Sequence, residues 1–133
     1  MFRNRPWSPP APGDFLVVGD GTVDVTYSSI GLESTESDST HCDLHFGGLA
    51  ATIKITHTNI STSPYGLMLY GGSGVDLTYN NWFGNGIDIE TMSGVRADVS
   101  NEWFAKGAPA ATAGATLVAN SLAAARLVAA GPR

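Results

Sequence analysis

The sequence has few of the residues on which several classes of protein depend. Among its 133 residues there is one cysteine, Cys42, which excludes an intramolecular disulfide framework and any metal site built from several cysteines. Seven basic residues against twelve acidic ones give a net charge of -5, which argues against nucleic acid as a partner. No apolar run reaches the roughly 20 residues of a transmembrane helix, and the opening leads into prolines, so we expect neither a membrane span nor a signal peptide.

Charged residues are also scarce, at 14% of the chain against about 25% in ordinary soluble domains. Glycine, serine, threonine and asparagine are plentiful instead, which predicts a turn-rich all-β protein. Four of the seven prolines fall within residues 1–13, which we interpret as an extended tail. We expect a repeat domain over residues 14–107 and an alanine-rich segment over residues 108–133.

One pattern recurs four times along the chain, with apolar and polar residues alternating as they do in a β-strand. The four segments are residues 23–30, 53–60, 75–82 and 95–103. The last two intervals between their starts are nearly equal, which predicts stacked coils, and the first interval is longer because it includes a polar loop over residues 33–40. The alternation predicts inward columns led by Val23 and Val25, and an outward column of alternating charge formed by Asp24, Lys54, Asp76 and Arg96.

Each segment ends in a small polar pair followed by a large apolar residue, which predicts a turn and then a buried side chain. The apolar residues are Ile30, Ile60, Trp82 and Trp103, and the last of them requires a bulge at Glu102. Asparagine in these pairs suits a left-handed turn. A second strand is expected in each coil, over residues 43–46, 65–70 and 86–90.

The run from Val75 to Ile87 resembles the repeat of right-handed parallel β-helices, the pectin-lyase-like superfamily. The resemblance covers roughly residues 22–107 and implies a short solenoid of four to five coils. It implies an extracellular or cell-surface setting and carbohydrate as a partner. Open ends of so short a solenoid predict end-to-end self-association or membership of a longer chain. The alanine-rich segment is either a capping helix over 115–130 or a fifth coil beginning at Leu117.

Three sets of residues are candidates for chemistry. His41, Asp43 and His45 alternate, so in a strand they share one face and could bind a divalent metal such as zinc; the alternative is a plain polar face. No other cofactor is predicted. The carboxylates Asp76, Asp88 and Asp98, with Glu90 beside them, are candidates for the acid and base of glycoside hydrolysis. Tyr27, His57 and Tyr79 occupy equivalent positions and could stack on sugar rings.

These observations leave two main classes of function open. The first is a non-catalytic module with a binding or structural role at a carbohydrate-rich or cell-surface site. The second is a polysaccharide lyase or glycoside hydrolase resembling the enzymes of the superfamily. A metal-dependent enzyme using His41, Asp43 and His45 is a third and smaller possibility.

Overall fold

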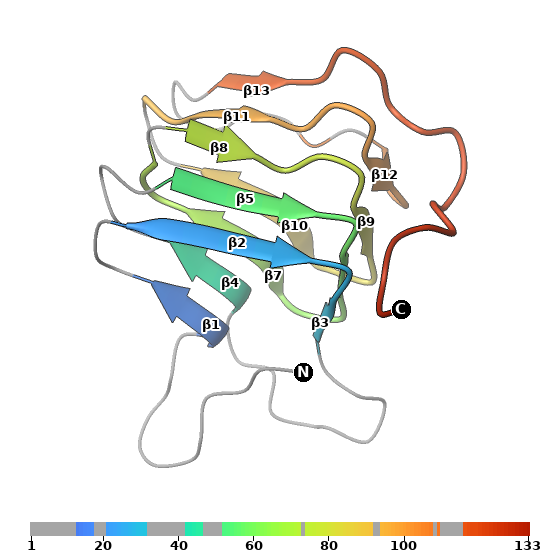
Figure 1. Cartoon of the computed structure of the whole chain (residues 1–133), viewed down its shortest axis with the longest axis horizontal. Coiled ribbons are helices and arrows are strands. Elements are labelled where there is room, and N and C mark those ends of the chain that lie inside the picture. Colours follow the sequence, from blue (N-terminus) through green and yellow to red (C-terminus); the bar gives the residue numbers. More distant parts are fainter. Residues whose placement is uncertain are drawn as a thin grey trace.

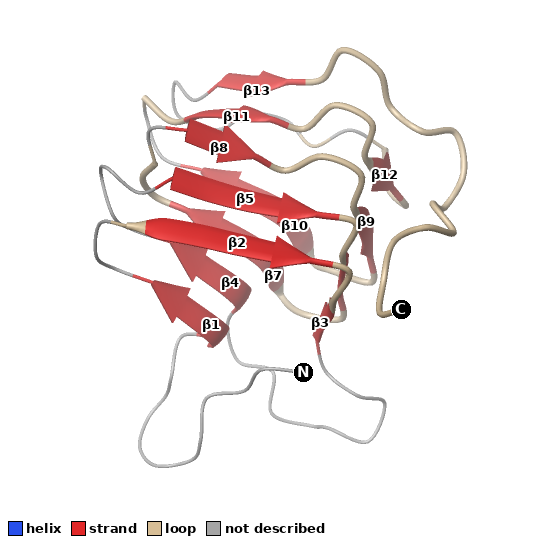
Figure 2. Cartoon of the chain, viewed as in Figure 1, coloured by secondary structure: helices blue, strands red, loops and turns tan. Residues whose placement is uncertain are grey.

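The computed structural model describes residues 13–17 (backbone only), 21–31, 42–46, 52–72, 74–91, 94–107, 109 and 116–133. The proposed tail up to residue 12 and the expected loop over 33–40 lie outside these ranges. The described chain contains strands and loops and no helix, which confirms the all-β prediction (Figure 2). Among the described residues no helix has the length and apolar character needed to cross a bilayer.

The strands form three parallel sheets, and the chain visits the three in the same order again and again (Figure 1). Sheet A contains β1 (Gly13–Val17), β4 (Cys42–Phe46), β7 (Tyr65–Leu69) and β10 (Ile87–Thr91). Sheet B contains β2 (Thr22–Thr26), β5 (Thr52–Thr56), β8 (Gly74–Asp76), β11 (Arg96–Asp98) and β13 (Thr116–Val118). Sheet C contains β3 (Ser29–Gly31), β6 (Asn59–Ser61), β9 (Asn81–Phe83) and β12 (Trp103–Phe104). One passage through sheets A, B and C is called a coil below.

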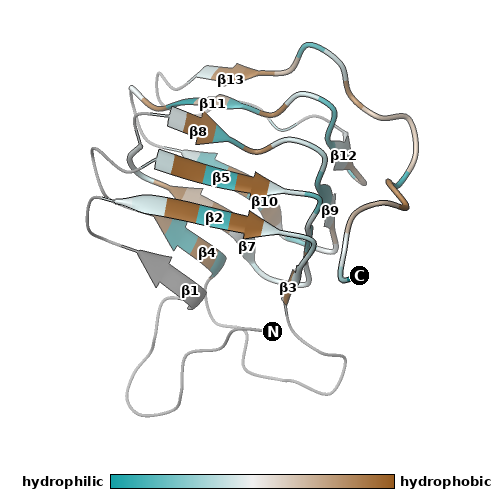
Figure 3. Cartoon of the chain, in the orientation of Figure 1, coloured by the Kyte–Doolittle hydropathy of each residue, from teal (hydrophilic) through white to brown (hydrophobic). Residues whose placement is uncertain are grey.

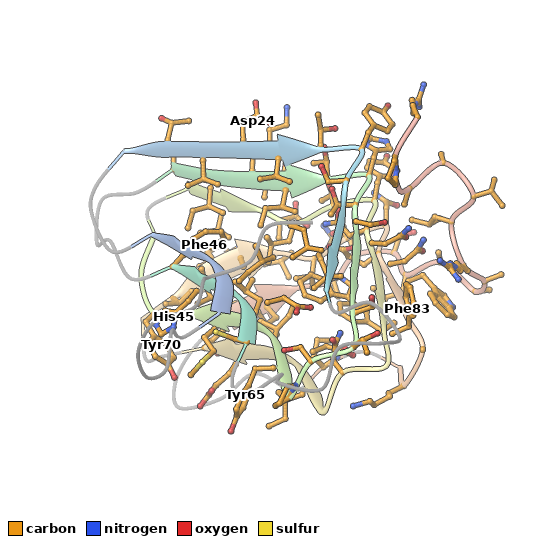
Figure 4. All side chains as sticks on the ribbon, turned by 90° about the horizontal axis from the view of Figure 1, so that it is seen from below. Asp24, His45, Phe46, Tyr65, Tyr70 and Phe83 are labelled. Carbon is orange, nitrogen blue, oxygen red and sulfur yellow. The ribbon has the colours of Figure 1, made fainter. Side chains whose placement is uncertain are left out.

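Strands of successive coils pair in register, as the sequence predicts for the first three coils. Asp24 pairs with Lys54, and Lys54 pairs with Asp76. The hydropathy of β2 and β5 alternates along each strand, so one face of sheet B is apolar and the other polar (Figure 3). Asp24 accordingly projects away from the interior (Figure 4).

The register of the fourth coil differs from the prediction by two residues. Asp98, and not Arg96, pairs with Asp76, while Ala97 pairs with Val75. The predicted alternation of charge therefore ends with two neighbouring aspartates. All residues that pair between the third and fourth coils are the same number of positions apart in the sequence. Aligning Val95 with Val75, as the sequence pattern suggests, gives a number that is smaller by two.

The core lies between the three sheets and consists of in-register apolar columns. Sheet B contributes Val23, Ile53, Val75, Ala97 and Leu117, followed by Val25, Ile55, Leu77 and Val99. Sheet A contributes Leu44, Leu67 and Ile89, together with Phe46 and Leu69. Sheet C contributes Ile30, Ile60, Trp82 and Phe104, all of them at most 6% exposed. Stacking of like positions removes these side chains from water in every coil, which is the main source of stability in such an arrangement.

The aromatic residue that stacks on Trp82 is Phe104 and not Trp103, so the prediction of a buried Trp103 is wrong. The Trp82 and Phe104 rings lie 5.8 Å apart and nearly parallel, whereas Trp103 pairs with Asn81 and contacts Phe83 on the outer side. The constant separation between the two coils places Phe104 in the inward position without an extra residue. The bulge expected at Glu102 is therefore not needed.

The corner between sheets B and C turns through a left-handed residue in each coil. These residues are Tyr27, His57, Tyr79 and Asn101, with φ between 49° and 64°. Asparagine was expected in this role, and it has the role only in the fourth coil. In the first three coils residues with ring side chains have this backbone conformation, and their rings stack on one another.

The described alanine-rich residues form a strand and an irregular segment. β13 pairs with β11, which places Thr116–Val118 in sheet B as the start of a fifth coil; the alternative of a helix is not found in residues 116–133. The chain then descends along the corner between sheets B and C to the height of β3 (Figure 1).

Candidate functional site

The outer face of sheet B is a regular array of polar side chains. Two outward columns cross its five strands: Thr22, Thr52, Gly74, Arg96 and Thr116; and Asp24, Lys54, Asp76, Asp98 and Val118. Parallel strands are about 4.8 Å apart, so successive side chains in each column follow one another at that spacing.

Asp76 and Asp98, two of the three carboxylates considered for catalysis, are neighbours on this face. The Thr78 hydroxyl donates to Asp76 Oδ1 at 2.7 Å, and the Ser100 backbone N–H donates to Asp98 Oδ1 at 2.9 Å. Hydrogen bonds from Ser100 hold the pKa of Asp98 below its ordinary value, and the charge of Arg96 acts in the same direction. Asp98 is therefore a stable anion and lacks the raised pKa that a general acid needs.

A depression of about 500 Å³ lies beside these groups on the same face. Its lining includes the side chains of Arg96, Asp98 and Val118, together with the glycines at the starts of β8 and β11. Gly74 interrupts the column that begins with Thr22 and Thr52, so that column contributes no side chain at this position. A ligand on this face would meet one guanidinium and one carboxylate in the depression.

Asp88, the third candidate carboxylate, belongs to sheet A and is 6% exposed. Asn85 Nδ2 donates to its Oδ1 at 3.0 Å, which accounts for its burial as a structural hydrogen-bond acceptor. Glu90 is on the same strand, β10. The structure therefore brings Asp76 and Asp98 together and leaves Asp88 on a different sheet.

Tyr27, His57 and Tyr79 form one continuous stack, as their equivalent positions in the sequence predict. The ring centroids are 4.8 Å apart between Tyr27 and His57 and 5.1 Å apart between His57 and Tyr79. The rings turn their faces toward one another, and the Arg133 guanidinium lies 3.8 Å from the centre of the Tyr27 ring. Sugar rings stack on aromatic faces, so the stack offers a ligand mainly ring edges and the 45% exposed Tyr79.

The candidate metal ligands lie on β4 in sheet A. Asp43 is buried, while His45 is partly exposed and meets Tyr70 edge-on at 5.2 Å (Figure 4). Cys42 Sγ lies 3.8 Å from His45 Nδ1, and His41 is outside the described residues. Within the part of the chain that the structure describes, no three side chains of His, Cys, Asp or Glu come together as a metal ion would require. The zinc site stays a prediction.

Tyr70, whose ring contacts His45, is a second titratable group beside sheet A. Burial raises the pKa of Tyr70 above its ordinary value, and the negative charge of Glu90, which also forms a hydrogen bond with the phenol, adds to the increase. Tyr70 is therefore a neutral hydrogen-bond donor at physiological pH.

One functional feature that the sequence analysis missed is a buried polar ladder at the corner after sheet B. The Ser28 N–H donates to the Thr58 hydroxyl, the Thr58 N–H donates to Asn80 Oδ1 at 2.9 Å, and the Asn80 N–H donates to Glu102 Oε2 at 2.7 Å. Asn80 Nδ2 adds a bond of 3.0 Å to Glu102 Oε1. The equal spacing of Thr58, Asn80 and Glu102 along the sequence was the available signal, but Glu102 was interpreted as an extra residue.

Comparisons with models of protein families, with curated proteins and with solved structures found no match for this chain.

Proposed function

We propose that the chain is a short right-handed parallel β-helix of four to five coils that acts as a non-catalytic module binding an uncharged polysaccharide. The observation that supports this is the in-register array on the outer face of sheet B, where two columns of mainly hydroxyl and charged side chains cross five strands, interrupted by Gly74 and Val118. A glycan chain lying across the strands would meet a hydroxyl or charged side chain from at least one of the two columns at each coil. Such a role suits a carbohydrate-rich setting outside the cell or at its surface.

The charges on this face favour an uncharged ligand over an acidic one. Asp24, Asp76 and Asp98 outnumber the two cations of the array, Lys54 and Arg96, and the chain as a whole has a net charge of -5. A polyuronate would therefore be repelled. Hydroxyl-rich neutral sugars would instead accept from the cations and threonines and donate to the carboxylates.

The test is binding of soluble neutral glycans, with a pair of matched variants. The triple change Thr22→Val, Thr52→Val and Thr116→Val removes three exposed hydroxyls while retaining the β-branched shape. The control, serine at the same three positions, retains the hydroxyls. In affinity electrophoresis against a panel of neutral and acidic glycans, we expect the valine variant to lose about tenfold or more in affinity while the serine variant binds as the parent does. Equal binding by both variants, or no binding by the parent, would refute the proposal.

The alternative class is cleavage of a polysaccharide, and it would have to use the neighbouring pair Asp76 and Asp98. Carboxylates on adjacent strands have the short separation used by retaining glycosidases. Incubation of the same glycans with concentrated protein would reveal reducing ends or unsaturated products. Products that disappear in the Asp98→Asn variant would establish catalysis in place of simple binding.

A further inference from the structure

The C-terminal tail, residues 126–133, lies along the corner between sheets B and C and makes backbone hydrogen bonds to side chains and backbone there. The Leu127 N–H donates to Asn81 Oδ1 at 2.8 Å, and Asn81 Nδ2 donates to the Leu127 carbonyl at 2.9 Å. The Gly131 N–H donates to the His57 carbonyl at 2.8 Å. The Asn81 amide thus bonds both backbone polar groups of Leu127, a contact that does not depend on the side chain of that residue. The Leu127 carbonyl also accepts from the Ala130 N–H at 3.4 Å, which closes a turn in the tail.

Two guanidinium groups of the tail rest on aromatic rings of the corner. The guanidinium carbon of Arg126 lies 4.3 Å from the centre of the Phe83 ring, and that of Arg133 lies 3.8 Å from the centre of the Tyr27 ring. Cations are attracted to the negative face of an aromatic ring. The docking corner, defined here as Tyr27, His57, Asn59, Asn81 and Phe83, therefore recognises a peptide with an arginine at each end.

The asparagines of the docking corner are held in place by the coils themselves. Asn81 is fully buried, and its Nδ2 also donates to Asn59 Oδ1 at 2.9 Å, while Asn59 Nδ2 donates to the Ser29 hydroxyl at 3.3 Å. These bonds fix the orientation of the Asn81 amide without any help from the tail. A recognition group that is oriented in advance loses little freedom when it binds a peptide.

The tail itself is held weakly. Val128 is fully exposed and Arg126, Ala129 and Pro132 are exposed, so the segment buries little apolar surface. Ordering a run of eight residues is entropically costly, and a small number of surface hydrogen bonds and cation–π contacts offsets only part of that cost. The tail is thus poised to leave the docking corner and expose it.

We propose that the docking corner is a peptide-binding site, occupied here by the tail of its own chain, and that it accepts the same tail from a second copy. The ligand is a segment with the sequence Arg-Leu-Val-Ala-Ala-Gly-Pro-Arg, as in residues 126–133, with a turn between Leu127 and Ala130. A second copy is the favoured occupant because its tail reproduces every contact described above.

Gly131 provides a variant that affects the tail and leaves the docking corner intact. Its φ is +107°, a conformation that side chains resist, and a Cβ there would lie 2.7 Å from Asn59 Nδ2. The full-length Gly131→Ala protein should therefore fold with an open docking corner. Its native state is checked by the fluorescence of the buried Trp82.

The experiment measures binding of a fluorescent peptide of residues 123–133, with an amidated end, to full-length proteins by anisotropy. We expect the peptide to bind the Gly131→Ala protein at least about tenfold more tightly than it binds the parent, because the competing tail is displaced. A peptide carrying the same Gly131→Ala change should not bind, and one carrying Arg133→Ala should bind more weakly. Failure of the unmodified peptide to bind the open protein at millimolar concentration, or equal binding of all three peptides, would overturn the proposal.

The exchange between copies has its own measurement in analytical ultracentrifugation. A mixture of the parent, which supplies a competent tail, and the Gly131→Ala protein, which supplies an open docking corner, should form a one-to-one complex. The Gly131→Ala protein alone should not form it, and this comparison separates tail exchange from end-to-end stacking of coils. Absence of the mixed complex at concentrations where the peptide binds would rule out a second copy as the occupant.

Discussion

Replacing Glu102 by glutamine should change how the stability of the protein depends on pH. Glu102 is fully buried, and both of its carboxylate oxygens accept hydrogen bonds from Asn80, at 2.7 and 3.0 Å. Burial raises the pKa of Glu102 well above 4.5, and the hydrogen bonds from Asn80 only partly oppose this. The folded protein therefore retains a proton on Glu102 at a pH where the unfolded chain has released it.

The sign of the effect follows from this difference in proton binding. The contribution of Glu102 to stability is complete below pH 4.5 and is lost as the pH rises through the pKa of the folded state. Within that window the loss is about 1.4 kcal/mol for each pH unit, the value for one proton. Glutamine does not titrate. As the pH rises, the free energy of unfolding of the parent should therefore fall relative to that of the variant by this amount for each pH unit.

Urea denaturation followed by tryptophan fluorescence, in steps of pH from 4.5 upwards, measures both curves. At the acidic end the Glu102→Gln protein should be the less stable by about 1–3 kcal/mol, because the amide nitrogen of glutamine cannot accept from Asn80, whereas the hydroxyl oxygen of the protonated carboxyl still can. The groups that the two proteins share cancel in the difference. Parallel curves across the whole range would refute the assignment of a buried, titrating carboxyl at this position.

Two further predictions test the register and the exposed carboxylate. The change Phe104→Ala should lower the free energy of unfolding by about 3–5 kcal/mol, because it opens a cavity beside Trp82. The change Trp103→Ala, on the outer side, should lower it clearly less. Chemical denaturation of the two variants measures both losses, and a larger loss for Trp103→Ala would show that the register is wrong. The change Asp98→Asn should destabilise the protein at neutral pH and have no effect once the pH is well below 3.8. The reason is that the lowered pKa of Asp98 stabilises the folded state only while the carboxyl is ionised. A destabilisation of the same size in acid would show that the hydrogen bonds from Ser100 are not its cause.

The sequence predicted those parts of the fold that depend on local alternation. Val23 and Ile53 were placed correctly because a strand with a period of two defines its inward face without reference to the rest of the chain. The register of the fourth coil could not be obtained in this way, because Trp103 and Phe104 are adjacent aromatics and each matches Trp82 equally well in type. Only the constant separation between paired residues, seen in all three sheets together, selects Phe104.

In the candidate site, too, the contacts between equivalent repeat positions could be predicted from the sequence, and those that depend on the register could not. Stacking of Tyr27 on His57 followed from equivalent positions in two repeats. The contact between Asn81 and Leu127 spans 46 residues and involves the backbone of the tail, so no pattern of side chains announces it. The neighbouring aspartates and the buried Glu102 were missed for the same reason as Phe104, since each follows from the register.

The equal step between the third and fourth coils determines which changes of length the architecture tolerates. Because paired residues are equally far apart along the sequence in sheets A, B and C, duplicating or excising a stretch of that length there returns every following side chain to its former column. Insertion of a single residue within a strand would instead exchange the buried and exposed faces of the residues that follow it in that strand. The protein could therefore be lengthened or shortened by whole coils, either by design or by natural duplication of the same number of residues.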